Sequence, residues 1–256
     1  MDVKRFVLAL AVGLLAGNSP ADASEIRVLS TIAVKSVMED LIPRFERESG
    51  HRVAIQYGTT AVLKRQIDAG ENFDVAIFTP PELIEEMIKQ GKIAVDTRAD
   101  FARTSIGVAV RAGTPRPDIS SVEAFQKSLL AAKSIGYTDP ARGGTSGIYL
   151  RGLIDRLGIA GQVDPKTKLS AGIPPLVEAI AKGEVEIGVL QISEIVPDPR
   201  LELVGPLPKG LEKSTVMTMG LRTDSKEAAA GRALIRFLAS PTVWPVIKAK
   251  GMEPGS

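Results

Sequence analysis

Four short segments of the chain combine small and hydroxyl-bearing residues at points where an apolar strand pattern gives way to a helix pattern. They are Ser30-Thr31-Ile32-Ala33, Gly58-Thr59-Thr60, Thr79-Pro80 and Arg142-Gly143-Gly144-Thr145-Ser146-Gly147. The first turn of a helix leaves backbone N–H groups without partners, and the helix dipole favours negative charge there. Ordinary helix capping by serine or threonine explains any one such segment. Four in one chain favour a binding site for a small anionic ligand.

The residue types that most other site chemistries need are scarce. The chain of 256 residues has no cysteine and a single histidine, His51. Zinc sites draw their ligands mainly from these two residue types, so no metal centre is expected. The same scarcity argues against a cysteine nucleophile or a Ser-His-Asp triad, and we predict no catalytic residue and no cofactor.

The charge balance also narrows the possible partners. The formal net charge is +2, with 32 basic and 30 acidic residues. This balance gives no reason to expect binding to nucleic acid or to an anionic membrane surface. The length is sufficient for one large domain or two smaller ones, each with its own core.

The first 23 residues have the pattern of a secretory signal. Lys4 and Arg5 begin it, an apolar run follows over 6–15, and Ala21-Asp22-Ala23 offers a small-residue cleavage site. The run is shorter than the about 20 residues that a membrane-spanning helix needs. Residues 1–23 are therefore predicted to be a signal peptide that is removed on export, which places the mature chain in the periplasm.

Strand and helix patterns alternate along the mature chain. Strands are predicted over 25–30, 52–57, 73–78, 105–110, 134–137, 168–170, 187–191, 201–204 and 215–221. Helices are predicted over 34–49, 61–69, 146–157, 175–182, 226–238 and 242–250, with a further helix beginning at Pro80-Pro81. The alternation indicates an α/β fold with a parallel sheet covered by helices, and ligands of such sheets bind at the carboxyl ends of the strands.

The chain changes character near residue 104, and no flexible linker marks the change. This predicts two lobes joined by strands rather than two separate domains. Residues 24–106 and 216–256 are predicted to form the first lobe, and residues 107–215 the second.

Several motifs resemble, in their order along the chain, those of one protein family. They are Val28–Lys35, Tyr57–Ala69, Asp74–Phe78, Asp139-Pro140 with Ser146–Tyr149, and Gly183–Gly188. With these motifs the chain resembles the periplasmic molybdate-binding proteins of ABC transporters and their wider type II solute-binding relatives, over essentially all of the mature chain. The resemblance implies two α/β lobes, a hinge of crossing strands, a ligand cleft between the lobes, an ABC permease as partner, and a monomer.

The first-lobe contact positions that the resemblance implies are kept only in part. Ala33 stands where the family has an oxyanion-binding serine. Thr59 and Thr60 retain the family's second hydroxyl site. In the second lobe, Gln191 stands where the family has a tyrosine after an apolar strand. Two side-chain contacts to a molybdate-like oxyanion are therefore absent from this chain.

The remaining contact positions lie in the second lobe. The resemblance implies backbone donors near Ser146 and Ile173, and the loop before Ser146 is one residue longer than in the family and carries Arg142 and Thr145. An arginine can form two parallel hydrogen bonds with a carboxylate. This change favours a small organic acid over a bare oxyanion.

Two functions follow from these patterns, and a third, ligand sensing for a membrane receptor, would share the same fold. The first is capture of a small anion for an ABC transporter without catalysis; its predicted contacts are Ser30, Thr31, Ala33, Thr59, Thr60, Thr79, Arg142, Thr145, Ser146, Ile173 and Gln191. The second follows from a similarity to periplasmic aconitate isomerases, which implies movement of a proton within a bound tricarboxylate. The base for that reaction would be Lys35, Tyr149 or a carboxylate such as Glu194.

Overall fold

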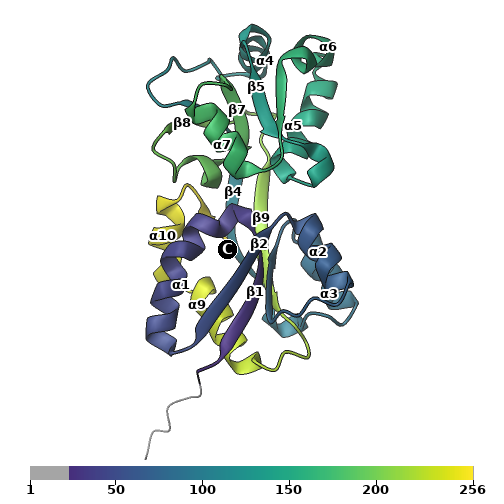
Figure 1. Cartoon of the computed structure of the whole chain (residues 1–256), viewed down its shortest axis with the longest axis vertical. Helices are drawn as coiled ribbons and strands as arrows, with labels where there is room; N and C mark the ends of the chain where they lie inside the picture. Colours follow the sequence, from purple (N-terminus) through teal and green to yellow (C-terminus); the bar gives the residue numbers. More distant parts are fainter. Residues whose placement is uncertain (1–22, 256) are drawn as a thin grey trace, which may run out of the picture.

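In the computed structural model, which describes residues 23–255, the chain forms two α/β lobes stacked along the long axis of the molecule (Figure 1). The signal peptide predicted over residues 1–23 lies, except for Ala23, outside the described residues, so this prediction stays untested. Between residues 23 and 255, none of the helices has the length and apolar character needed to cross a bilayer.

The alternation of strands and helices is confirmed. The strands are β1 (Glu25–Thr31), β2 (Arg52–Gly58), β3 (Val75–Phe78), β4 (Ala99–Arg111), β5 (Ile135–Thr138), β6 (Thr167–Ser170), β7 (Ile187–Gln191), β8 (Leu201–Pro206), β9 (Ser214–Leu221) and β10 (Glu253–Pro254). The α-helices are α1 (Lys35–Ser49), α2 (Thr60–Asp68), α3 (Glu82–Lys89), α4 (Val122–Ala131), α5 (Thr145–Arg156), α6 (Ala160–Val163), α7 (Ile173–Ala181), α8 (Ile192–Ile195), α9 (Ala228–Ala239) and α10 (Trp244–Ala249).

The sheet is mixed, and the prediction of a parallel sheet is wrong at its centre. Across the described residues the strand order is β2-β1-β3-β9-β4-β7-β5-β6, with β8 and β10 also paired to β4. Strand β1 is parallel to β2 and β3, and β5 is parallel to β6 and β7. Strands β4 and β9 are antiparallel to each other and to their other neighbours. The difference arises because one strand carries the chain into the second lobe and another returns it in the opposite direction.

Strand β4 connects the lobes. Its first half, Ala99–Ser105, pairs with β9, whereas its second half, Ile106–Arg111, pairs with β7 and β8. Figure 1 shows β4 and β9 running side by side between the two lobes. The residues at which the lobes divide stay a prediction.

Helices cover both faces of the sheet in each lobe. In the first lobe α1, α9 and α10 lie on one face and α2 and α3 on the other (Figure 1). Helix α1 shows the local cause: Val37, Leu41 and Phe45 recur on one buried stripe, and Gly50 ends the helix in the left-handed conformation at φ 76°. In the second lobe α4, α5 and α6 are opposed by α7 and α8 in the same way. This layering turns the carboxyl ends of the parallel strands of both lobes toward the space between them.

Candidate functional site

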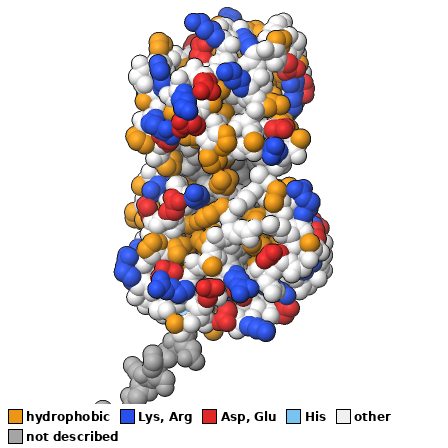
Figure 2. Space-filling model, in the orientation of Figure 1, with side chains coloured by type: hydrophobic (Ala, Val, Ile, Leu, Met, Phe, Trp, Pro, Cys, Tyr) orange, Lys and Arg blue, Asp and Glu red, His pale blue; other side chains and the backbone are white. Residues whose placement is uncertain are grey.

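A cavity of about 130 Å³ lies between the lobes, and we call it the interlobe cavity. Figure 2 shows the surface hollowed at the waist of the molecule, with mostly uncharged side chains around the hollow. All of the predicted contacts except Ser30 line this cavity: Thr31, Ala33, Thr59, Thr60, Thr79, Arg142, Thr145, Ser146, Ile173 and Gln191. Ser30 is fully buried, and its hydroxyl donates to the carbonyl oxygen of Thr31 at 3.2 Å. The structure thus gathers residues from both lobes, while their role in binding stays a prediction.

Besides α8, which is capped by Gln191, three helices begin at the cavity, one in the first lobe and two in the second. They are α2, α5 and α7, whose first turns leave backbone N–H groups free to bind an anion. At α2 the cap is Thr59, whose side-chain oxygen accepts from the N–H of Val62 at 3.4 Å. Because that bond uses the oxygen as an acceptor, the hydroxyl hydrogen of Thr59 stays available to donate into the cavity.

Several buried polar atoms of the cavity wall have no hydrogen-bond partner. They are the hydroxyl oxygens of Thr60, Thr79 and Thr138 and the amide oxygen of Gln191. All of these residues are at most 7% exposed. Native proteins satisfy nearly all of their buried polar groups, since an unpaired one costs about 1–3 kcal/mol. Several unpaired polar atoms are expected in one cavity when a bound ligand supplies their hydrogen-bond partners.

Thr138 is a wall residue that the sequence analysis missed. It is the last residue of β5, one position beyond the predicted strand, and the Asp139-Pro140 turn follows it. Gly144 and Gly147 lie against it, and a Cβ atom at Gly144 would meet the Thr138 hydroxyl oxygen at 2.6 Å. A threonine at the carboxyl end of a strand, before a glycine-rich turn into a helix, was the available signal.

The two lobes touch at the edge of the cavity. Gly143 has φ 79°, and a Cβ atom placed there would come within 2.9 Å of the Cβ of Ala61 at the start of α2. Arg142, one residue earlier, lines the cavity while remaining exposed to solvent, which puts it at the rim. The two lobes thus form a closed cleft, and Arg142 places one positive charge at its rim.

Glu194 is the acidic residue of the wall. Its carboxylate accepts from the backbone N–H of Gln191 at 2.9 Å. Burial raises the pKa of Glu194 to about 7, and the hydrogen bond from Gln191 acts in the opposite direction. A group that titrates near neutral pH inside a cavity can exchange a proton with a bound molecule.

The other two candidate bases lie elsewhere. Lys35 lines a neighbouring pocket of about 620 Å³ that shares Glu194 with the interlobe cavity, and its ammonium lies 3.7 Å from Glu39. Tyr149 is half-buried, and its hydroxyl donates to the carbonyl oxygen of Leu211 at 3.2 Å. Of the three, Glu194 is the one that the fold brings to the cavity wall.

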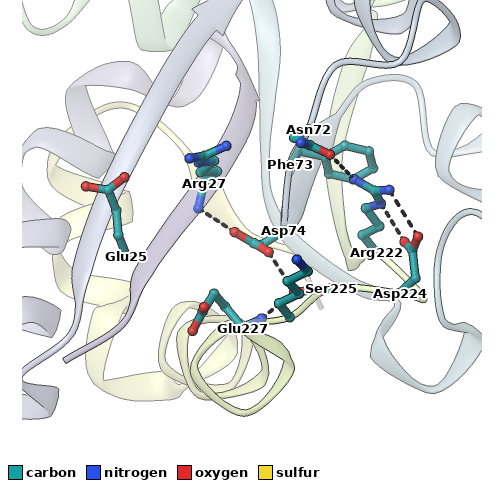
Figure 3. A pocket seen from close by; sticks show the side chains of 10 residues that line it. Glu25, Arg27, Asn72, Phe73, Asp74, Arg222, Asp224, Ser225 and Glu227 are labelled. Carbon is teal, nitrogen blue, oxygen red and sulfur yellow. Dashed lines mark hydrogen bonds and ion pairs between the residues drawn. The ribbon is translucent and has the colours of Figure 1, made fainter. Parts of the chain in front are cut away.

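A second pocket, of about 450 Å³, lies at the end of the first lobe away from the second, and we call it the lobe-1 pocket. Its side chains bind one another (Figure 3). Asp74 accepts from the backbone N–H of Arg27 at 2.8 Å and from the hydroxyl of Ser225 at 2.6 Å. Arg222 donates to Asn72 at 2.8 Å and pairs with Asp224. This pocket is larger than the interlobe cavity, but none of its residues has a buried side-chain polar atom without a hydrogen-bond partner.

Comparison with known proteins gives consistent results over nearly the full length. A family model for bacterial extracellular solute-binding proteins matches residues 26–253. An aconitate isomerase of a Pseudomonas species is 30% identical over 96% of this chain and 95% of its own length. The molybdate-binding protein ModA of Azotobacter vinelandii is 26% identical over 98% of this chain and 97% of its own length. The solved structure of the Azotobacter vinelandii periplasmic molybdate-binding protein covers 89% of this chain and 98% of its own, with a TM-score of 0.73 and 18% identity.

Proposed function

This chain belongs to the bacterial extracellular solute-binding protein family, and from that premise we propose that it captures a small anion in the interlobe cavity and delivers it to an ABC permease. The family match confirms the resemblance carried by the motifs, and the structural neighbours confirm the type II periplasmic binding fold. In this proposal the mature chain acts in the periplasm as a monomer, after export directed by residues 1–23.

The observation that carries the proposal is the set of unpaired polar atoms in the cavity wall. Thr60, Thr79 and Thr138 each hold a buried hydroxyl without a partner, and they come from both lobes. An anion between them would accept hydrogen bonds from these hydroxyls and from the helix N-termini. Closure of the lobes then excludes water and strengthens each of these bonds.

The size of the cavity favours a compact anion. At roughly 30 Å³ for each water-sized group, the cavity of about 130 Å³ has room for about four. A tetrahedral oxyanion such as molybdate, or a small carboxylate, fits this volume. A tricarboxylate with about twelve non-hydrogen atoms would have to extend into the neighbouring pocket that contains Lys35. Arg142 at the rim is placed to pair with a carboxylate that reaches out of the cavity.

Thermal unfolding of the mature chain against a panel of anions tests the proposal. The panel contains molybdate, sulfate, phosphate, citrate and cis-aconitate, each added at increasing concentration. A ligand at about a hundred times its dissociation constant stabilises the folded state by roughly 2.7 kcal/mol. For a chain of this size the midpoint should rise by on the order of 5–10 °C. A midpoint that none of these anions moves would contradict the proposal.

A second function, isomerisation of a tricarboxylate, is favoured by Glu194 together with the 30% identity to an aconitate isomerase. In that reaction the Glu194 carboxylate would remove a proton from the methylene carbon of aconitate. The double bond would shift, and the same proton would return to the other allylic carbon, so that no further reactant is consumed.

Proton NMR of cis-aconitate incubated with the purified chain separates the two functions. Appearance of the trans isomer at a rate proportional to protein concentration, lost in Glu194→Gln, would support the isomerase. Bound but unchanged cis-aconitate would support the carrier. Reaction that persists in Glu194→Gln would exclude Glu194 as the base.

A further inference from the structure

One part of the cavity wall is made of hydrogen-bond acceptors, although the rest of the wall offers donors. The side-chain NH₂ group of Gln191 donates to the hydroxyl oxygen of Thr215 at 3.2 Å, and the buried amide oxygen of Gln191 faces the backbone N–H of Glu194 in a capping box without forming a full hydrogen bond. Gln191 is the last residue of β7, and Glu194 lies three residues later in α8. One of its carboxylate oxygens accepts from the Gln191 backbone N–H, so the other is free to meet a ligand. An anion without hydrogen atoms can satisfy neither acceptor.

The charged groups around Glu194 do not neutralise it. Besides Arg142 at the rim of the cavity, they lie in the neighbouring pocket, on α1, on α7 and after α8: Lys35, Glu39, Glu178, Asp198 and Arg200. The ammonium of Lys35 is 3.7 Å from Glu39, and the guanidinium of Arg200 is 2.8 Å from both Glu178 and Asp198. Among the described residues, Glu194 has no ion pair. Both cations of the neighbouring pocket are thus engaged with other carboxylates.

On the basis of the proposed function, we propose that the anion is bound together with one proton, which it shares with Glu194. The ligand class is then an anion that carries its own hydrogen-bond donor, such as a singly protonated oxyanion or a hydroxy acid. A fully deprotonated anion binds only when Glu194 takes up a proton from solution. In either case one hydrogen bond replaces a repulsion between two negative groups.

The physical reason lies in the low polarity of the closed cavity. Two negative groups in contact there repel strongly, because little water screens them. A proton between them removes one charge and forms a charge-assisted hydrogen bond. Burial raises the pKa of Glu194 to about 7, so that the proton is available near neutral pH at small cost. The free carboxylate oxygen becomes the donor, while the other keeps its bond from Gln191.

Calorimetric titration at pH 8 in two buffers of different ionisation enthalpy counts the protons that binding takes up. The probes are molybdate and cis-aconitate, which carry no exchangeable proton at this pH. The wild-type chain should take up most of one proton for each anion bound, because pH 8 lies above the Glu194 pKa of about 7 and most Glu194 side chains begin ionised. Affinity should fall by roughly ten-fold or more between pH 7 and pH 9.

Two variants make the test specific. Glu194→Gln keeps the acceptor for the Gln191 N–H and supplies a permanent NH₂ donor, so proton uptake should vanish and affinity should become independent of pH. Glu46→Gln is the matched control: Glu46 also accepts a backbone N–H, that of Val53 at 2.9 Å, but it does not line the cavity. It should leave proton uptake unchanged.

Each outcome decides between the two proposals. Uptake near one proton that is lost in Glu194→Gln supports the shared proton. Tight binding of either probe without uptake overturns it and leaves the proposed function standing. Uptake that persists in Glu194→Gln overturns the assignment to Glu194. Absence of binding for both probes and for every anion of the thermal panel overturns the proposed function, and the shared proton with it.

Discussion

The interlobe cavity and the lobe-1 pocket differ in how their polar groups are satisfied. The lobe-1 pocket is the larger, at about 450 Å³ against about 130 Å³, and it contains more charged side chains. In it Asp74 and Arg222 each bind neighbours from other parts of the chain (Figure 3). In the interlobe cavity the side-chain hydroxyls of Thr60, Thr79 and Thr138 have no hydrogen-bond partner. We therefore base the proposed site on the unpaired buried polar atoms and not on volume or charge.

The difference also assigns a role to each region. The Asp74 carboxylate joins β1, through Arg27, to the segment before α9, through Ser225. These bonds hold distant parts of the first lobe together, so their energy goes into folding. The cavity hydroxyls form no comparable bonds in the ligand-free fold, and in our proposal they form their hydrogen bonds only with the anion. Substitutions in the two regions should therefore have opposite signatures.

The largest expected effect is on stability, from Asp74→Ala. Asp74 is 8% exposed and accepts from both Arg27 and Ser225, and hydrogen bonds to a charged group contribute about 1.5–3 kcal/mol each. We expect the free energy of unfolding, measured in urea, to fall by about 3 kcal/mol or more. Anion affinity of the folded fraction should not change.

Asp224→Ala is the control within the same pocket. Asp224 pairs with Arg222, but its side chain is 71% exposed, so that water replaces the interaction at little cost. Its unfolding curve should match that of the wild type. A loss of anion binding in Asp74→Ala without loss of stability would reverse the comparison between the two pockets.

Thr60→Val should have the opposite signature. The change removes the unpaired hydroxyl and keeps the shape of the side chain, so the stability of the ligand-free protein should be unchanged or slightly higher. Affinity for the anion found in the thermal panel should fall by roughly ten-fold to a hundred-fold, since a hydrogen bond to a charged group contributes about 1.5–3 kcal/mol. Titration calorimetry and urea unfolding of the same preparation measure both quantities.

Thr97→Val is the matched control for Thr60→Val, because the hydroxyl of Thr97 has hydrogen-bond partners. Thr97 is also buried, but its hydroxyl donates to Ala94 at 2.6 Å and accepts from the N–H of Leu221 at 2.9 Å. This variant should lose stability and keep its affinity. If Thr60→Val were the less stable of the two, the unpaired hydroxyl would not be the mark of the binding site.

Local sequence patterns predicted most elements of the fold because each element carries its own signal. Helix α1 has a regular buried stripe and a glycine cap. The first half of β4 was missed because a bulge between Asp100 and Ala102 breaks the alternation that identifies a strand. Helix α4 was missed although Ser121 caps it and Phe125 and Leu129 recur on its buried face, so its signal was present but short.

The residues of the candidate site also fall into two groups, those that local sequence patterns predict and those that depend on packing. Thr59 and Thr145 belong to local loop-to-helix patterns, and such patterns can be read without the fold. The Thr138 hydroxyl is buried beside Gly144 without a partner, and the titration of Glu194 depends on burial by neighbouring segments. Ser30 differs from the other predicted contacts, because its hydroxyl bonds to the carbonyl oxygen of Thr31 and does not line the cavity. Only the three-dimensional packing determines these features.

The pH dependence of stability tests whether Glu194 carries an unfavourable buried charge in the absence of ligand. The pKa of Glu194 is about 7 in the folded chain and near 4.5 when unfolded, so the folded state binds the proton more tightly. Between these values the folded state holds more protons, and stability must fall as pH rises from about 4.5 to 7. We expect a loss of roughly 1–3 kcal/mol in urea unfolding that is absent from Glu194→Gln. Equal slopes in both chains would contradict the burial of this charge.

The smallest expected effect distinguishes closure of the cleft from folding. Gly143→Ala puts a side chain in the left-handed conformation, which costs roughly 1–2 kcal/mol, and also places its Cβ against Ala61 of the other lobe. Gly113→Ala has the same strain at φ 77°, but its Cβ would meet nothing within 4 Å. Both variants should therefore lose similar stability, whereas only Gly143→Ala should bind its anion more weakly, on the order of ten-fold in calorimetry. Equal affinity in the two variants would mean that the contact between Gly143 and Ala61 is not needed for the bound state, and that the donors of one lobe are sufficient to hold the anion.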